Sequence, residues 1–402
     1  MRTWLTLAAV LAAVAAFVPS PVEGADMPNP LLAEWTTPFG VPPFDQIEPE
    51  HYLPAFRVAM ERHKAEVEAI AGARSKPTFA NTIEALENSG LLLERVNLCF
   101  GNLSSAETGP ELQAIDREVS PMLASHSDDI TLNEKLFQRV KAVWESRAGL
   151  KLAPDQAKLL EDAWKGFVRG GALLGPEQKE RFRAINTELA SLGVKFGDDV
   201  LAGTNAYQLV VDVPADLAGL SEQVVQTAAA DAREAGLEGK WLFTLHRMPG
   251  DRSFLEQAES RELRREYLQA YLERCSQGDS LDNRALASRT AALRAERAQL
   301  LGYRTHADFV LDESMAKTPA GVRGLLDQLW KPAVAVAGRE AADLQAAIAA
   351  DGKDFTLEPW DWSYYAEKVR KARYDLDEQA LRPYFELERV RQGAFDVATK
   401  LF

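Results

Sequence analysis

Helical periodicity runs through almost the whole of this 402-residue chain and predicts a mainly α-helical fold. Apolar side chains recur three or four positions apart, which places them on one face of an α-helix. Gly, Pro, Asn and Asp separate these segments, and the short connections favour antiparallel packing of neighbouring helices. The pattern predicts helices over 52–70, 83–95, 111–126, 136–144, 156–168, 176–196, 261–271, 284–301 and 325–348.

Individual residues mark the expected ends and bends of these helices. Asn81 lies three residues before Glu84, which is the spacing of a capping box, and predicts the start of the helix over 83–95. Gly302 predicts the end of the helix before it, because glycine readily adopts the left-handed conformation found there. Pro332 predicts a kink in the last long helix, since proline removes a hydrogen bond from the helix interior.

One short region departs from the helical pattern. Tyr207 to Val213 has the composition of a β-strand and is ended by Pro214. A second strand is expected over 240–245, after a helical stretch over 221–236. The sequence therefore predicts a small β element near 207–245, with the appearance of a β–α–β insertion in a helical protein.

Composition excludes several classes of protein. Hydrophobic residues make up 46% of the chain, which is incompatible with wholesale disorder. The 60 acidic residues outnumber the 46 basic ones, giving a net charge of −14, and this argues against a nucleic-acid partner. The two cysteines, Cys99 and Cys275, cannot form a disulfide framework. Each lies in a helical pattern, so two separate buried thiols are favoured over a single disulfide.

The first 24 residues resemble a secretory signal peptide. Arg2 supplies the positive start, an apolar run covers 4–18, and Pro19 and Pro21 break it before a small-residue cleavage site at Gly24. An uncleaved anchor is the alternative, but the run is shorter than the roughly 20 residues that span a bilayer. We therefore expect an exported, periplasmic protein without stable membrane insertion.

The chain has no motif that assigns a catalytic or metal-binding residue. The histidines are widely spaced in sequence, so the His-Glu-x-x-His pattern of zinc peptidases is absent. A Gly-x-Ser-x-Gly elbow, a phosphate loop and a dinucleotide fingerprint are also absent. Each histidine taken alone is more typical of a structural or exposed residue than of a ligand. The residues concerned are His51, His63, His126, His246 and His306.

Aromatic residues are unusually dense near the end of the chain. Trp360, Trp362, Tyr364 and Tyr365 fall within six residues, and a basic helical segment follows over 366–373. One interpretation is the wall of a substrate cleft, where aromatic rings and hydroxyls hold a peptide. The favoured interpretation is a packing cluster between helical layers, because Trp and Tyr bury large areas.

Several segments together carry a family resemblance. They are Asn-Pro-Leu-Leu at 29–32, Ile-Glu-Pro-Glu-His-Tyr at 47–52, Thr-Phe-Ala-Asn-Thr-Ile-Glu-Ala-Leu-Glu at 78–87, Leu-Leu-Gly-Tyr at 300–303, Trp-Asp-Trp-Ser-Tyr-Tyr-Ala-Glu-Lys at 360–368 and Leu-Arg-Pro-Tyr-Phe at 381–385. The chain resembles the thimet-oligopeptidase family of zinc metallopeptidases. Trp362 and the basic run that follows favour the bacterial dipeptidyl carboxypeptidase branch.

The resemblance implies a fold and a chemistry. Members have two helical lobes flanking a channel that admits short unfolded peptides, and a carboxydipeptidase releases dipeptides from the free C-terminus. The family's zinc is held by a His-Glu-x-x-His helix and a later Glu, downstream of the segment at 381–385. No residue of this sequence matches those ligands or the catalytic Glu, and the apolar helical pattern at 394–402 continues to the last residue. We therefore expect a C-terminally truncated chain that binds no stoichiometric zinc and is inactive alone.

The signal sequence and the resemblance together divide the chain into three parts. These are the signal peptide at 1–24, an N-terminal helical region with the small β element at 25–250, and the start of a catalytic domain at 251–402. Two alternatives remain open. The first is a non-catalytic exported protein that kept a peptide-binding lobe, and the second is an unstable pseudogene fragment with an incomplete core.

Overall fold

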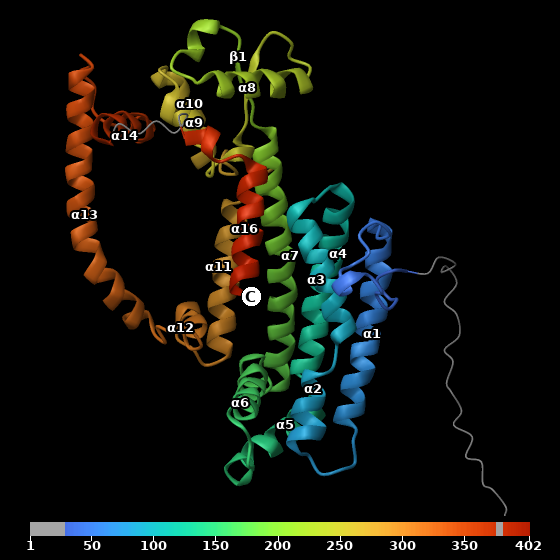
Figure 1. The fold of residues 1–402 in the computed structure, drawn as a ribbon. Helices are drawn as coiled ribbons and strands as arrows, with labels where there is room; N and C mark the ends of the chain where they lie inside the picture. The colour runs from blue at the N-terminus through green and yellow to red at the C-terminus, as the bar shows by residue number, and fades with distance from the viewer. Residues whose placement is uncertain (1–28, 375–380) are drawn as a thin grey trace, which may run out of the picture. The chain divides into compact units, whose positions relative to one another are not determined.

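The computed structural model describes residues 29–374 and 381–402, so the predicted signal peptide at 1–24 lies outside the described residues. The chain divides into two compact units, Met1–Ile115 and Asp116–Phe402. Both units are built from helices, with a single two-stranded sheet in the described part of the second (Figure 1). The mainly α-helical prediction is therefore confirmed.

The first unit is centred on a pair of packed helices. The rings of Tyr52 and Phe56 on α1 meet the ring of Phe100 on α3 edge to face, with centroids 5.1 Å and 5.6 Å apart. All three rings are buried, so they form the centre of this unit's core. Its elements are η1 (Pro38–Gly40), η2 (Pro49–His51), α1 (Tyr52–Ala71), η3 (Phe79–Glu84), α2 (Ala85–Glu87), α3 (Leu91–Ala106) and the first residues of α4 (Pro110–Thr131).

The helix predicted over 83–95 is wrong at both ends. Thr78, not Asn81, is the N-cap, and the two side chains form the capping box with each other's backbone N–H. The helix then stops, because Gly90 adopts a left-handed conformation with φ of 74°. A side chain at Gly90 would collide with the His63 ring, 2.7 Å from the position of a Cβ atom. Contact with another helix therefore sets this break.

Helices also make up most of the second unit. The predicted helices over 111–126, 136–144, 156–168 and 176–196 are all present, and α4 and α7 extend well beyond their predicted ends, to Thr131 and Ala206. The elements are α4, α5 (Glu134–Glu145), η4 (Arg147–Gly149), α6 (Pro154–Arg169), α7 (Pro176–Ala206), β1 (Leu209–Val211), η5 (Pro214–Leu217), α8 (Glu222–Glu234), β2 (Trp241–Phe243), η6 (Leu245–Arg247), α9 (Ser253–Gln257), α10 (Arg261–Leu272), α11 (Arg284–Leu300), α12 (His306–Leu311), α13 (Pro319–Ala350), α14 (Pro359–Tyr374), η7 (Arg382–Tyr384) and α16 (Leu387–Leu401).

Ion pairs set the register of two long helices in this unit. Arg181 on α7 donates two hydrogen bonds of 2.6 Å to Glu296 on α11. Arg289 pairs in the same way with Glu188, at 2.6 Å and 2.8 Å. Because the residue numbers rise on α7 as they fall on α11, the two helices are antiparallel, as short connections predicted.

The β element is confirmed, but its strands are antiparallel. Leu209 faces Phe243 and Val211 faces Trp241 in the register. The β–α–β appearance of the sequence would ordinarily indicate parallel strands joined by a crossover helix. Here α8 packs against β2, and the chain returns in the opposite direction.

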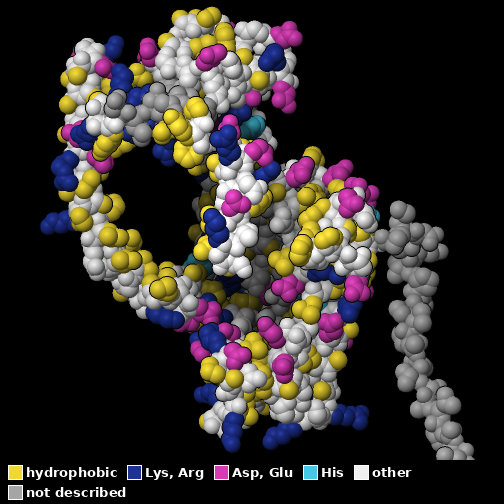
Figure 2. All heavy atoms as spheres, in the orientation of Figure 1, with side chains coloured by type: hydrophobic (Ala, Val, Ile, Leu, Met, Phe, Trp, Pro, Cys, Tyr) yellow, Lys and Arg dark blue, Asp and Glu magenta, His cyan; other side chains and the backbone are white. Residues whose placement is uncertain are grey.

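Two helices of the second unit bear long exposed apolar faces. Figure 2 shows hydrophobic side chains along α13, where Leu329 is 57% and Trp330 is 71% exposed. On α16, no side chain is buried, and Phe395 is 59% exposed. Pro332 lies inside α13, which remains one helix and curves along its length (Figure 1).

The cysteines and the helix end at Gly302 agree with the sequence analysis. Cys99 and Cys275 are both buried and both free, as expected, but only Cys99 lies in a helix; Cys275 lies in the turn after α10, with a positive φ of 58°. Gly302 has φ of 84°, and its N–H bonds to the carbonyl of Gln299 at the end of α11. Among the described residues, none of the helices combines the length and apolarity needed to cross a bilayer.

Candidate functional site

The aromatic segment singled out in the sequence forms the first half of α14. Tyr365 is 3% exposed and packs with the buried residues Leu344 and Ile348 of α13. Burial raises the pKa of its hydroxyl above the ordinary value. The ring of Tyr364 stands edge-on to that of Tyr365, with centroids 5.1 Å apart. These two rings therefore join helices and do not line an open surface.

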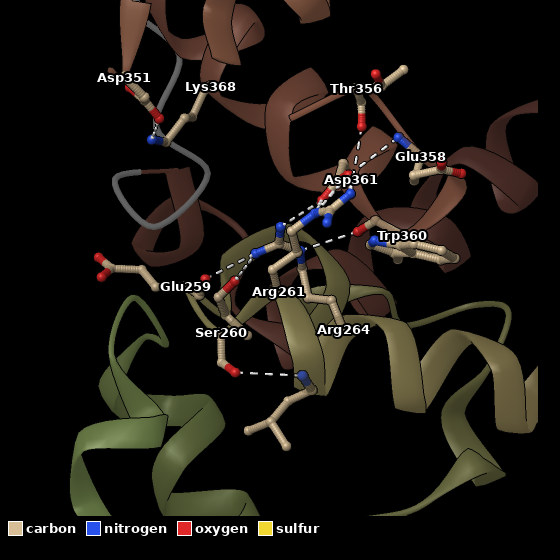
Figure 3. Close-up of polar contacts among 12 residues, drawn as sticks. Glu259, Ser260, Arg261, Arg264, Asp351, Thr356, Glu358, Trp360, Asp361 and Lys368 are labelled. Atoms are coloured by element: carbon tan, nitrogen blue, oxygen red, sulfur yellow. Dashed lines mark hydrogen bonds and ion pairs between the residues drawn. The ribbon is translucent and has the colours of Figure 1, made fainter. Parts of the chain in front are cut away.

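A buried charge cluster anchors the start of α14. Asp361 has no exposed surface and lies opposite two arginines of α10 (Figure 3). Arg261 reaches it with Nε at 3.0 Å and Nη2 at 2.8 Å, and Arg264 with Nη2 at 3.0 Å. The backbone N–H of Glu358 adds a fourth donor at 3.1 Å. The hydrogen bonds to Asp361 hold the pKa of Arg261 above its ordinary value.

Arg264 connects this cluster to the chain before α10 and to the backbone of α14. Its Nη1 donates to the carbonyl of Ala258 at 2.7 Å, and its Nε to the carbonyl of Trp360 at 3.1 Å. The guanidinium also lies 4.2 Å from the centroid of the Tyr364 ring. Only 1% of Arg264 is exposed, so every contact is made away from solvent. A buried arginine with this many acceptors holds α10 and α14 in one arrangement.

Trp362 is the aromatic residue of this segment that faces outward. It is 38% exposed and lines a groove of about 860 Å³ between α14 and the loop before α9. Arg252 and Glu256 lie on the loop and α9 side, and Glu367 and Arg370 on the α14 side. Arg370 donates to Glu367 at 2.7 Å and 2.9 Å. An indole beside charged groups of both signs is suited to contact a peptide chain.

The packing interpretation accounts for three of the four aromatic residues of this segment, and the substrate-cleft interpretation stays a prediction for the fourth. Trp360, Tyr364 and Tyr365 make the packing contacts of a helix junction, and Trp362 alone lines the groove. The arginines of α10 carry no signal in the local sequence. Arg264 and Asp361 are 97 positions apart, so only the tertiary structure could bring them together.

The histidines do not converge on one place. His51 accepts a hydrogen bond from the backbone of Glu48 at the start of η2. His63 packs beneath Gly90, and burial lowers the pKa of its ring. His246 is exposed in η6.

The two remaining histidines lie in the second unit, on α4 and α12. His126 is partly buried on α4. His306 is partly buried at the start of α12, and burial together with nearby arginines lowers the pKa of its ring.

The described residues offer no donor set for the zinc ion that the family resemblance implies. No group of three or more His, Cys, Asp or Glu side chains is placed to hold a metal ion within 29–374 and 381–402. A catalytic zinc needs three protein ligands, and the scattered histidines do not supply them.

Comparison with known proteins shows that the chain is similar to peptidases. Residues 254–402 match peptidase family M3. The chain is 40% identical to the dipeptidyl carboxypeptidase of Escherichia coli K12 over 375 residues, which cover 93% of this chain and 55% of that protein. It is 32% identical to oligopeptidase A of the same bacterium over 380 residues, covering 94% of this chain and 55% of the relative.

The same relationship extends to plants. The chain is 32% identical over 393 residues to a probable cytosolic oligopeptidase A of Arabidopsis thaliana, covering 93% of this chain and 53% of that protein. These matches confirm the predicted resemblance: the chain is similar to these peptidases along nearly its whole length, and its residues 254–402 match peptidase family M3. It spans about half the length of the curated relatives it matches.

Proposed function

We propose that this chain forms part of a zinc-dependent peptidase that releases dipeptides from the C-terminus of short peptides. The observation that carries the proposal is the 40% identity to a dipeptidyl carboxypeptidase over 93% of the chain. The identity to oligopeptidase A is lower, at 32%, which favours the carboxydipeptidase branch. The substrates would be short unfolded peptides.

We also propose that these 402 residues alone hydrolyse no peptide and bind no stoichiometric zinc. The support is the lack of a His-Glu-x-x-His pattern in the sequence and of a suitable donor cluster among the described residues. The test is elemental analysis of the purified chain together with a fluorogenic peptide assay. We expect less than one zinc in ten chains and no turnover. Turnover that a chelator abolishes and added zinc restores would overturn the proposal.

The division of the chain and its location are part of the same proposal. The match to family M3 begins at residue 254, which supports a catalytic region starting near 251 after an N-terminal region over 25–250. Arg2 and the apolar run at 4–18 support export to the periplasm. Expression with and without residues 1–24, followed by cell fractionation and N-terminal sequencing, tests both the export and the cleavage site.

A non-catalytic peptide-binding protein is the second candidate. It is favoured by the groove at Trp362, which combines an exposed indole with charges of both signs. Calorimetry with short peptides, in parallel with the turnover assay, separates the two candidates. Binding without hydrolysis under every metal condition would support this one. Broad thermal unfolding and rapid proteolysis of the exposed helices α13 and α16 would instead favour the unstable fragment.

A further inference from the structure

A second groove, lined by helices of the second unit, is built differently from the one at Trp362. It has a volume of about 950 Å³ and lies among α4, α7 and α11, with the end of α6 and Phe309 of α12 completing its lining. Apolar side chains form much of its wall, including Phe182, Leu189 and Phe196. Its charged residues are Asp128, Arg169, Arg294 and Arg297.

Asp128 is a buried hydrogen-bond acceptor, and one of its two carboxylate oxygens has no donor. Only 4% of the residue is exposed. Its Oδ1 accepts a hydrogen bond of 2.8 Å from Nδ2 of Asn186 on α7, and its Oδ2 is buried without any partner in the described chain. Burial raises the pKa of this carboxyl to about 6, against the opposing effects of Asn186, Arg183 and Arg297. A ligand that donates an N–H to Oδ2 would complete this group.

Arg297 and Arg294 are cations of this groove that make no direct ion pair within the described residues, although the charge of Asp128 acts on Arg297. Arg297 Nη1 donates to Oδ1 of Asn186 at 3.1 Å, and its Nε is buried without a partner. Burial, with the like charge of Arg294, lowers the pKa of Arg297. Neither arginine makes an ion pair within the described residues. Arg169 differs, because Asp312 and Glu313 already pair with it at 3.2 Å and 3.0 Å.

The charges of the unpartnered groups indicate the ligand, because the carboxylate of Asp128 suits an ammonium group and the guanidinium groups of Arg297 and Arg294 suit a carboxylate. One amide side chain, that of Asn186, separates Asp128 from Arg297 and hydrogen-bonds to both. We propose that this groove binds a free zwitterionic dipeptide, with its ammonium group on Asp128 and its carboxylate on Arg297 and Arg294.

The apolar wall leaves room for the dipeptide's side chains, and the volume is sufficient for a ligand of this size. The choice of a dipeptide over other zwitterions rests on the proposed function, in which dipeptides are the product. The observation that Asp128 and Arg297 have unpartnered atoms in the groove does not depend on that function.

Isothermal titration calorimetry on the 402-residue chain at pH 7.5 tests the inference. The probe is Ala-Phe, with N-acetyl-Ala-Phe and Ala-Phe amide as matched ligands that each lack one terminal charge. We expect one Ala-Phe per chain and at least tenfold weaker binding of each blocked ligand. No binding of Ala-Phe, or equal binding of all three ligands, would overturn the assignment.

Variants place the binding in this groove. Asp128→Asn should remove the preference for Ala-Phe over its N-acetyl form, because the amide no longer attracts an ammonium group. Arg294→Gln and Arg297→Gln should each weaken Ala-Phe at least tenfold. Arg289→Gln is the control: Arg289 lies on the same helix, pairs with Glu188 and does not line the groove. Unchanged binding in all three groove variants would contradict the proposal.

The dipeptide-binding experiment can fail or succeed independently of the hydrolysis assay that tests the proposed function. Dipeptide binding needs neither zinc nor turnover, so it can be present when the hydrolysis assay is negative. Failure of Ala-Phe to bind would remove this inference and leave the peptidase proposal to its own test.

Discussion

Arg264 donates a hydrogen bond of 3.0 Å to Asp361, and almost no part of either residue is exposed to solvent. This pair joins α10 to α14 across 97 positions of the chain. Because Arg261 binds the same carboxylate, two cations depend on one buried anion. Removing that anion leaves two unpaired guanidinium groups, one of them fully buried.

We therefore predict that Asp361→Asn lowers the free energy of unfolding by about 3–5 kcal/mol. Urea denaturation followed by circular dichroism measures the change. Asp351→Asn is the matched control, since Asp351 pairs with Lys368 at the surface and should contribute about 0–1 kcal/mol. A loss of similar size in both variants would show that the buried cluster has no special role.

A second prediction concerns Gly90 and the ring of His63. Gly90→Ala places a Cβ atom about 2.7 Å from that ring. It also forces alanine into the left-handed conformation that Gly90 adopts. Gly302→Ala imposes the same backbone strain in open space, at a cost of about 1–2 kcal/mol. Overpacking should make Gly90→Ala less stable than Gly302→Ala by a further 1–3 kcal/mol or so. Equal thermal shifts would refute the ring contact.

The third prediction follows from the pKa of Asp128, which burial raises from 3.8 to about 6. Between pH 4 and pH 6 the unfolded chain loses this proton before the folded chain does, so Asp128 stabilises the fold less as the pH rises. Asp128→Asn should therefore raise the free energy of unfolding at pH 7.5 by about 1–3 kcal/mol and flatten the change between pH 4 and 6.

Chemical denaturation of both proteins from pH 4 to pH 7.5 measures this effect. Asp129→Asn serves as the control, because Asp129 is exposed and pairs with Arg183. If Asp128→Asn destabilised the chain throughout this range, the carboxyl would have to be ionised and well compensated in the folded state.

The fourth prediction compares two positions on α13. Ile348 is fully buried against α14, so Ile348→Ala should lower stability by about 2–5 kcal/mol. Trp330 is 71% exposed, so Trp330→Ser should change stability by no more than about 0.5 kcal/mol. Because the substitution removes an exposed apolar side chain, Trp330→Ser should also reduce the fluorescence of a hydrophobic dye bound to α13. A large stability loss in Trp330→Ser would show that its face of α13 is covered.

Local patterns were reliable where a single segment determines its own structure. The helices α4 to α7 and the end of α11 at Gly302 follow from apolar spacing and glycine geometry. The break at Gly90 did not follow, because the His63 ring on another helix imposes it. The direction of β1 and β2 also depends on how α8 packs, which no pattern within either strand encodes.

The candidate sites likewise combine features visible in one segment with contacts that only distant helices make. The aromatic segment at 360–365 was visible in the sequence, but its function as a junction depends on Arg261 and Arg264 of a distant helix. Asp128, Asn186 and Arg297 had no recognisable motif, because each comes from a different helix.

By itself, the sequence determined the helical class of this protein, its acidic balance and its relationship to the M3 peptidases, since periodicity, charge and family motifs are properties of the chain read in order. Only the tertiary structure decided which charges are buried, which are paired and which remain without a partner. Burial and pairing depend on distances between helices, and those distances arise only when the helices pack.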